Sequence, residues 1–150
     1  MRLVIQRVKE AKVEVNNQEV GAIKSGLLVF VGVEEADEME DVEWLARKVV
    51  AMRVFNDEEG HMNHDVKAVN GEILAVSQFT LHAATKKGNR PSFMRAADPK
   101  YAEKLYEQFK LQLGALIGEA IPAGTFGADM QVTLVNDGPV TITMDSKNRE

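Results

Sequence analysis

A run of side chains that could take part in an acyl transfer follows a predicted buried strand. The apolar run Ile73–Val76 gives way to Ser77, Gln78, Phe79 and Thr80. A hydroxyl can attack an ester carbonyl, and amide or backbone N–H groups can stabilise the oxyanion that forms. Ligands are often held at strand ends of an α/β sheet. Taken alone, however, the pattern is more typical of a strand that surfaces and ends in water.

A second segment, Asn136–Thr141, brings Asn, Asp, Gly and Pro together. This composition is typical of a tight turn, and it predicts a hairpin between strands at 129–135 and 139–144. The bond between Gly138 and Pro139 could instead be cis, as about 5–6% of X–Pro bonds are in folded proteins, and the flanking carbonyl groups would then point differently. The residues alone favour the hairpin.

A third segment gathers positive charge. Lys86, Lys87, Arg90 and Arg95 lie within ten residues, in a stretch whose Gly and Pro predict a loop, and Phe93 could stack on a base. The loop is a candidate for phosphate contacts from Lys86, Lys87 and Arg90. A solvated surface loop would look much the same.

Two weaker patterns point to other chemistry. His61 and His64 stand beside Asp65, but no third histidine lies near them, so a metal site is disfavoured and we expect none. Ser77 with His82 could form part of a serine esterase. No G-x-S-x-G motif surrounds Ser77, and five positions along a strand would put the two side chains on opposite faces.

The composition narrows the class of protein. The chain has 150 residues, typical of one domain, and its 18 Lys+Arg against 23 Asp+Glu give a net charge of −5. An acidic chain does not coat nucleic acid through phosphate neutralisation, although a local basic patch could hold one RNA end. The absence of cysteine excludes disulfides, Cys-bound metals and thiol nucleophiles. No glycine-rich phosphate motif and no apolar run of membrane-spanning length occurs, so we expect no cofactor, no membrane partner and a cytoplasmic location.

The hydrophobic pattern predicts the elements that hold these segments. Alternation indicates a long first strand whose parity shifts near Val8, as at a bulge. One helix is expected to begin at Asp37, and another at Asp98, where Pro99 follows as the first helical residue. We expect one α/β domain over residues 1–144 with curved, barrel-like mixed β-sheets and two main helices, in a homodimer, and a frayed charged tail at 145–150. The expected strands are 2–15, 18–23, 27–31, 73–81, 129–135 and 139–144.

Taken together, these segments resemble the D-aminoacyl-tRNA deacylase family. Ser77–Leu81 and Asn136–Thr141 resemble its two signature motifs, and the match runs in order from residue 1 to about 144. Further matching segments are Met1–Val8, Gly26–Val29, Arg53–Phe55, Arg90–Phe93 and Phe126–Met130. The resemblance implies hydrolysis of the ester that joins a D-amino acid, or glycine, to the 3′-terminal adenosine of tRNA.

The resemblance also implies roles for residues. Backbone N–H groups of Ser77–Thr80 would stabilise the oxyanion, Phe79 would shape the pocket, and Ser77 and Gln78 would hold the adenosine and the loop. In the family the bond between Gly138 and Pro139 is cis and reaches the partner subunit's active site. Its carbonyl groups would hold the substrate's amino group so that an L side chain collides with the protein. Asn136 and Met130 are placed in the same substrate-binding set.

Alternatives remain at this point. Thr80 could be a nucleophile, or the 2′-hydroxyl of the tRNA could assist water with no protein nucleophile. A non-catalytic module that binds the tRNA acceptor end would keep the basic loop but would need neither Thr80 nor the Gly138–Pro139 turn. A serine esterase would depend on Ser77.

Overall fold

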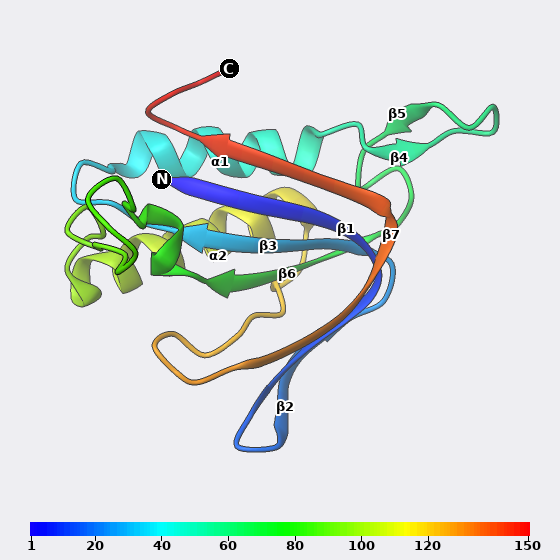
Figure 1. Ribbon diagram of the computed structural model, residues 1–150. Helices are drawn as coiled ribbons and strands as arrows, with labels where there is room; N and C mark the ends of the chain where they lie inside the picture. The colour runs from blue at the N-terminus through cyan, green and yellow to red at the C-terminus, as the bar shows by residue number, and fades with distance from the viewer.

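The computed structural model describes all residues from 1 to 150, and it shows a curled mixed sheet with both long helices packed on one face (Figure 1). The large sheet contains β1 (Arg2–Val15), β2 (Gln18–Ile23), β3 (Gly26–Gly32), β6 (Glu72–Ser77) and β7 (Gln131–Asp145). The helices are α1 (Met39–Ala51) and α2 (Pro99–Ile117). A small hairpin, β4 (Phe55–Asn56) with β5 (Met62–His64), and a 3₁₀ turn, η1 (Phe79–His82), complete the fold. The expected single α/β domain with two main helices and a curved mixed sheet is confirmed.

Strand β1 organises the sheet. It pairs antiparallel with β7 along almost its whole length, while its other edge pairs with β3 in its first half and with β2 in its second half. β3 and β6 pair in parallel, and the connection between them contains α1 and the small hairpin. The register between β1 and β7 shifts on both sides of Val8, which confirms the predicted bulge. A bulge increases local twist, and here it bends the sheet into a half-barrel.

The two faces of the sheet are packed differently. The face under the helices carries the larger core, in which Leu27, Val29 and Ile73 meet the apolar faces of α1 and α2. The opposite face carries a smaller cluster around Leu28, Leu74 and Val76. Both faces of β3 are therefore buried, as its unbroken apolar run predicts.

The predicted N-terminal cap is correct for one helix and wrong for the other. The Asp98 side chain accepts a hydrogen bond from the N–H of Lys100 at 3.0 Å, as expected for the cap of α2. The prediction that Asp37 begins α1 is wrong, since Glu38 is the N-cap and forms a capping box with Asp41. Asp37 is buried one residue earlier, where it accepts from the N–H of Glu34 at 2.7 Å and contacts the amino group of Met1.

Strand β7 replaces the predicted hairpin. It runs unbroken from Gln131 to Asp145, and the bond between Gly138 and Pro139 inside it is cis. Gln6 pairs with Thr141 and Val8 pairs with Asn136, so β7 has four intervening residues where β1 has one. The segment 137–140 therefore bulges out of the strand, because the shorter stretch of β1 cannot pair with all of it.

Two further expectations are wrong. The strand predicted over 73–81 ends at Ser77, because the chain turns into η1 and Leu81 donates its N–H to the Gln78 carbonyl at 3.2 Å. The tail is not frayed: Ser146 is buried, Lys147 pairs with Asp41 of α1 at 2.7 Å, and Arg149 lies over the ring of Trp44. Neither helix is both long and apolar enough to cross a membrane.

Candidate active site

The 3₁₀ turn η1 sits at the carboxyl end of the two parallel strands. Ser77 pairs with Val31 of β3, and the next N–H, that of Gln78, donates to the Val31 carbonyl at 2.7 Å. After this bond the backbone leaves the sheet and forms the turn Phe79–His82. The first N–H groups of a helical turn have no acceptor within it. The backbone at Phe79 and Thr80 is thus available to an oxygen outside the protein.

A cavity of about 490 Å³ lies beside this turn. The start of η1, the ends of β3 and β6, the beginning of α2 and the segment 126–130 surround it. Ser77, Gln78, Phe79 and Met130 line it, as expected for one site, whereas Thr80 does not. Other residues that line the cavity were not predicted as site residues. Among them are Ala96, Ala97, Pro99, Ala102, Tyr106, Phe126, Ala128 and Asp129.

Some of these additional residues carry a sequence pattern that indicates the hydrophobic core instead of a site. Ala102 and Tyr106 belong to the apolar face of α2 and are buried, so helical periodicity assigns them to the core. Asp129 is the only charged residue lining the cavity. It precedes Met130 in the segment 126–130, so the signal that could have found it was its position beside Met130 in a matching segment.

The polar side chains around the turn do not form a nucleophile and base. The Gln78 amide donates to the Thr80 hydroxyl, and no histidine or carboxylate bonds to Thr80. His82 is completely buried, and neither of its ring nitrogens has a hydrogen-bond partner, so no Ser77–His82 pair exists. Tyr106 donates its hydroxyl to the Ala75 carbonyl at 3.0 Å, and burial raises its pKa further, so it stays protonated. What the site offers an ester is backbone donors and a shaped cavity.

The segment containing Gly138 and Pro139 lies at the other end of the sheet. Asn136 pairs with Val8 of β1, which pairs with Gly26 at the beginning of β3, whereas Ser77 of β6 pairs with Val31 near the end of β3. Five residues along a strand span roughly 17 Å. Figure 1 shows the bend of β7 on the right, away from the arrowheads of β3 and β6. Within one chain, the two signature segments do not meet.

The side chain of Arg7 packs against the segment that contains Gly138 and Pro139. Its guanidinium is buried, and it donates to the carbonyl of Asp137 at 3.0 Å and to the carbonyl of Val54 at 2.5 Å. A Cβ added to Gly138, whose φ is +125°, would lie 2.9 Å from an Arg7 nitrogen. The bulge of β7 is therefore closely packed against Arg7 on its inner side, while Gly138 and Pro139 are exposed.

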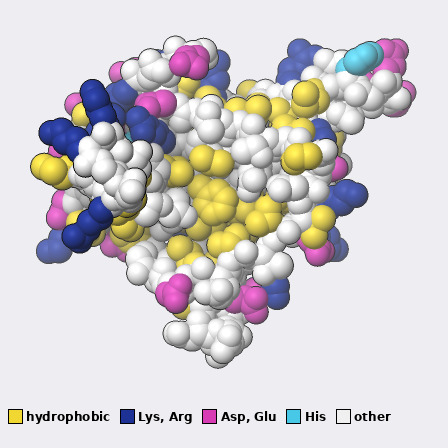
Figure 2. All heavy atoms as spheres, in the orientation of Figure 1, with side chains coloured by type: hydrophobic (Ala, Val, Ile, Leu, Met, Phe, Trp, Pro, Cys, Tyr) yellow, Lys and Arg dark blue, Asp and Glu magenta, His cyan; other side chains and the backbone are white.

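The predicted basic loop flanks the cavity. Lys86, Lys87 and Arg90 are exposed, and the loop closes through the pairing of Ala84 with Ser92. Phe93 contacts Phe79 edge-on, with ring centroids 5.1 Å apart. Figure 2 shows Lys and Arg side chains gathered on the left, beside a hollow lined with hydrophobic side chains.

The remaining candidates lie elsewhere. His61 and His64 are in the exposed β4–β5 arm, where His61 lies 3.6 Å from Glu59. Arg95 differs from the other three cations of its segment, because it binds Glu34 at 2.8 Å.

Comparisons with known proteins identify the family to which these segments belong. Residues 4–145 match the family described as D-Tyr-tRNA(Tyr) deacylase. The chain is 59% identical to the D-aminoacyl-tRNA deacylase of Akkermansia muciniphila over 150 residues, the whole of both chains. It is 56% identical to that of Dechloromonas aromatica, with 98% of each chain covered.

Two solved structures share the fold. The structure titled c-Myc DNA unwinding element binding protein is 41% identical, covers 97% of this chain and 98% of its own, and superposes with a TM-score of 0.90. A probable eukaryotic D-amino acid tRNA deacylase is 17% identical, with a TM-score of 0.82 and coverage of 95% and 97%, and shows the fold alone. With both signature segments present and the family match spanning nearly all of the curled sheet and its helices, the chain belongs to the D-Tyr-tRNA(Tyr) deacylase family.

Proposed function

We propose that this protein hydrolyses the ester bond of D-aminoacyl-tRNA, and of tRNA mischarged with glycine, to free amino acid and tRNA. The observation that carries the proposal is the cavity beside η1, which Ser77, Gln78 and Phe79 line in a chain of this family. A reaction on aminoacyl-tRNA belongs to the quality control of translation, and it takes place in the cytoplasm. The cavity holds the terminal adenosine and its aminoacyl group.

In the proposed reaction, backbone donors stabilise the transition state and the substrate supplies the proton transfer. Water adds to the ester carbonyl, and N–H groups of Ser77–Thr80 bind the oxyanion that develops. The bond between the carbonyl carbon and the 3′ oxygen then breaks, and the proton from water reaches that oxygen through the neighbouring 2′-hydroxyl. The absence of a base near Thr80 supports this division of roles.

Selection for the D-hand is assigned to Gly138 and Pro139. A pocket that accepts many side chains cannot measure handedness by side-chain fit, whereas fixed backbone carbonyl groups can. Those carbonyl groups hold the substrate's amino group, so that only a D side chain points away from the protein and an L side chain collides with it. Asn136, at the start of the bulge, and Met130, in the cavity, contribute to the same recognition.

A homodimer follows from this assignment. Gly138 of β7 and Ser77 of β6 lie beside opposite ends of β3, so the Gly138–Pro139 segment serves the site of a second copy. Two features support it: the segment bulges out of β7 and is exposed, and the sheet face without helices carries the partly buried side chains of Phe30, Val132 and Leu134. A twofold arrangement gives each copy the same exchange.

The test is a deacylation assay on matched D-Tyr-tRNA and L-Tyr-tRNA, with a chelator present and Thr80→Ala beside the wild type. We expect rapid loss of the D-ester only, and substantial activity in Thr80→Ala, because Thr80 serves neither as base nor as nucleophile. Near-complete loss in a folded Thr80→Ala variant would assign the nucleophile to Thr80. Binding of tRNA with no cleavage of either ester would identify a non-catalytic module. Sensitivity to Ser77→Ala and to serine-directed phosphonates would identify a serine esterase.

The basic loop makes a second prediction. If Lys86, Lys87 and Arg90 contact tRNA phosphates, changing all three to Gln removes about three neutralised phosphates. The slope of log affinity against log salt should then become shallower by about two to three. Filter binding of tRNA at several salt concentrations measures this. The same change at three exposed cations elsewhere, Lys24, Arg47 and Lys67, is the control. Equal slopes in both triple variants would remove the loop from the interface.

A further inference from the structure

A buried polar side chain stands at the end of the turn η1, and neither the proposed reaction nor the proposed chiral selection uses it. His82, the last residue of η1, is 1% exposed and its two ring nitrogens have no hydrogen-bond partner. An oxygen of the Glu34 carboxylate lies 3.9 Å from Nδ1 of the ring. Buried imidazoles normally satisfy at least one nitrogen. Elsewhere at this end of the turn, Arg2 donates to the Leu81 carbonyl at 3.1 Å, so Glu34 is the carboxylate that faces the ring itself.

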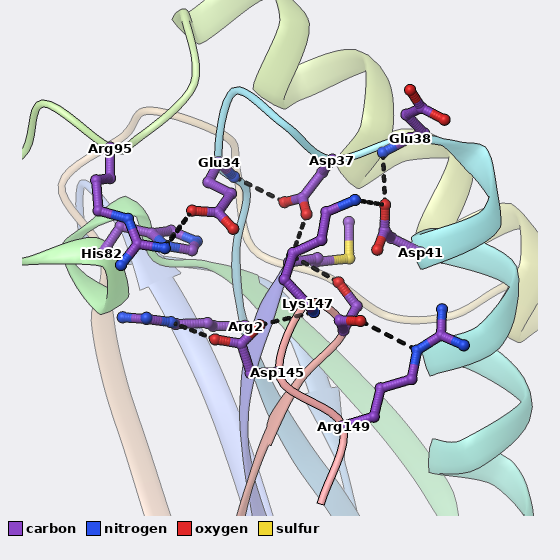
Figure 3. Close-up of polar contacts among 12 residues, drawn as sticks. Arg2, Glu34, Asp37, Glu38, Asp41, His82, Arg95, Asp145, Lys147 and Arg149 are labelled. Atoms are coloured by element: carbon purple, nitrogen blue, oxygen red, sulfur yellow. Dashed lines mark hydrogen bonds and ion pairs between the residues drawn. The ribbon is translucent and has the colours of Figure 1, made fainter.

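Glu34 is itself buried, at 6% exposed, and it stands on the connection between β3 and α1. Its Oε2 accepts a hydrogen bond from Arg95 Nη2 at 2.8 Å. Figure 3 shows the Glu34 carboxylate directed toward both Arg95 and His82. A buried carboxylate is costly without a partner, so Arg95 is held firmly although its own side chain is half exposed.

Arg95 belongs to the segment that carries the basic loop. Around it, Glu34 pairs with Ala96, and Ala97 donates its N–H to the Val33 carbonyl at 3.1 Å. Two residues before Arg95, Phe93 touches Phe79 edge-on. The loop therefore contacts the site at Phe79, and its root is fixed at Glu34.

We propose that Glu34 is a positioning residue for the deacylase reaction: its carboxylate joins Arg95 of the basic loop to His82 of η1 and so holds Phe93 against Phe79 at the cavity. The inference rests on the proposed active site at Ser77–Thr80. Glu34 touches neither substrate nor reacting atoms. It acts through the two segments that do.

Protonation of His82 gives this arrangement a distinct signature. Burial lowers the pKa of His82, while the backbone of Gly32 and then the Glu34 carboxylate oppose that shift, and the ring is neutral at pH 7. The other charges that face the ring are Arg2 and the amino group of Met1, both from the β1 side, which disfavour its protonation. As the pH falls, an imidazolium beside Glu34 competes with Arg95 for the same carboxylate. The rate should therefore fall on the acid side.

The experiment compares Glu34→Gln with Glu35→Gln, the same chemical change at the exposed neighbour, in single-turnover deacylation of D-Tyr-tRNA. Misplacement by about 1 Å can cost about a hundredfold in rate, so a lost tether is expected to lower the limiting single-turnover rate about tenfold or more, with little change in the enzyme concentration that gives half of that rate. In Glu34→Gln the acid limb should disappear, because no carboxylate is left for which the imidazolium and Arg95 could compete. A structural role alone would lower the rate equally at every pH.

Arg95 variants and a readout independent of activity complete the test. Arg95→Met should reproduce the loss, and Arg95→Lys should restore most of the rate because it keeps a cation. Trypsin should cut at Lys86 and Lys87 faster in Glu34→Gln than in Glu35→Gln. A folded Glu34→Gln that is indistinguishable from Glu35→Gln overturns the proposal. If Glu34→Gln fails to fold, a folded and fully active Arg95→Met overturns it instead. If the wild type itself spares the D-ester, the proposed function fails, while faster tryptic cleavage still reports the tether.

Discussion

Gly138→Ala is expected to lose hydrolysis of D-Tyr-tRNA by about a hundredfold, the cost of a misplacement of about 1 Å at a reacting centre. At φ +125° an L side chain is strained, and the added Cβ would lie 2.9 Å from Arg7 Nη2 and 3.1 Å from Val140 Cγ2. Arg7 is buried and donates to the carbonyls of Asp137 and Val54, so it cannot withdraw cheaply. The backbone of the bulge must shift instead, and its carbonyl groups move with it.

Gly60→Ala is the matched control. Gly60 also has a positive φ, +84°, but nothing lies within 4 Å of an added Cβ, and it stands in the β4–β5 arm. It should reproduce the backbone strain without the contact with Arg7, and it should keep the wild-type rate. The measurement is single-turnover loss of the D-ester together with thermal unfolding of each variant. A folded Gly138→Ala with wild-type rate and selectivity would remove the bulge from the site.

Local sequence signals predicted the elements whose stability is decided locally. The apolar run of β3, the Asp98 cap with Pro99 after it, and the parity shift at Val8 each depend on neighbours in sequence, and each is confirmed. The prediction that α1 begins at Asp37 was wrong, because the next residue, Glu38, is also a carboxylate that can cap a helix. The choice is made by a distant partner, because the amino group of Met1 occupies Asp37 and leaves Glu38 as the cap.

The site was only partly predictable, for the same reason. Ser77–Phe79 and Met130 were found by type and resemblance, and they meet at one cavity. That β7 continues through the Asn136–Pro139 segment depends on pairing with a bulged β1 and on contacts from Arg7, both distant in sequence. The turn at Phe79 was hidden because Phe79 and Leu81 continue the alternation of the strand. The Glu34–Arg95 pair joins residues 61 positions apart, which no local pattern predicts.

Mixing two inactive variants should restore activity if the site is shared between subunits. Gly138→Ala displaces the bulge, and Phe79→Ala removes the ring that the loop contacts at the cavity; alone, each is expected to lie far below the wild-type rate. In a mixed dimer, the intact turn of the Gly138→Ala copy faces the intact bulge of the Phe79→Ala copy. The other site of that dimer carries both defects. Random exchange makes half of the dimers mixed, so about a quarter of the sites should be complete.

The measurement is the rate of D-Tyr-tRNA loss after the variants are co-refolded, with each variant co-refolded alone as the control and size exclusion to verify the dimers. Recovery toward a quarter of the wild-type rate requires that turn and bulge come from different chains, because every single chain in the mixture has a defect. Stable mixed dimers without recovery would mean that the bulge serves the cavity of its own chain. The roughly 17 Å between the two segments along β3 argues against that outcome. If activity recovers in the mixed dimers, chirality is read only where two copies meet. Dissociation of the dimer should then abolish selectivity together with rate.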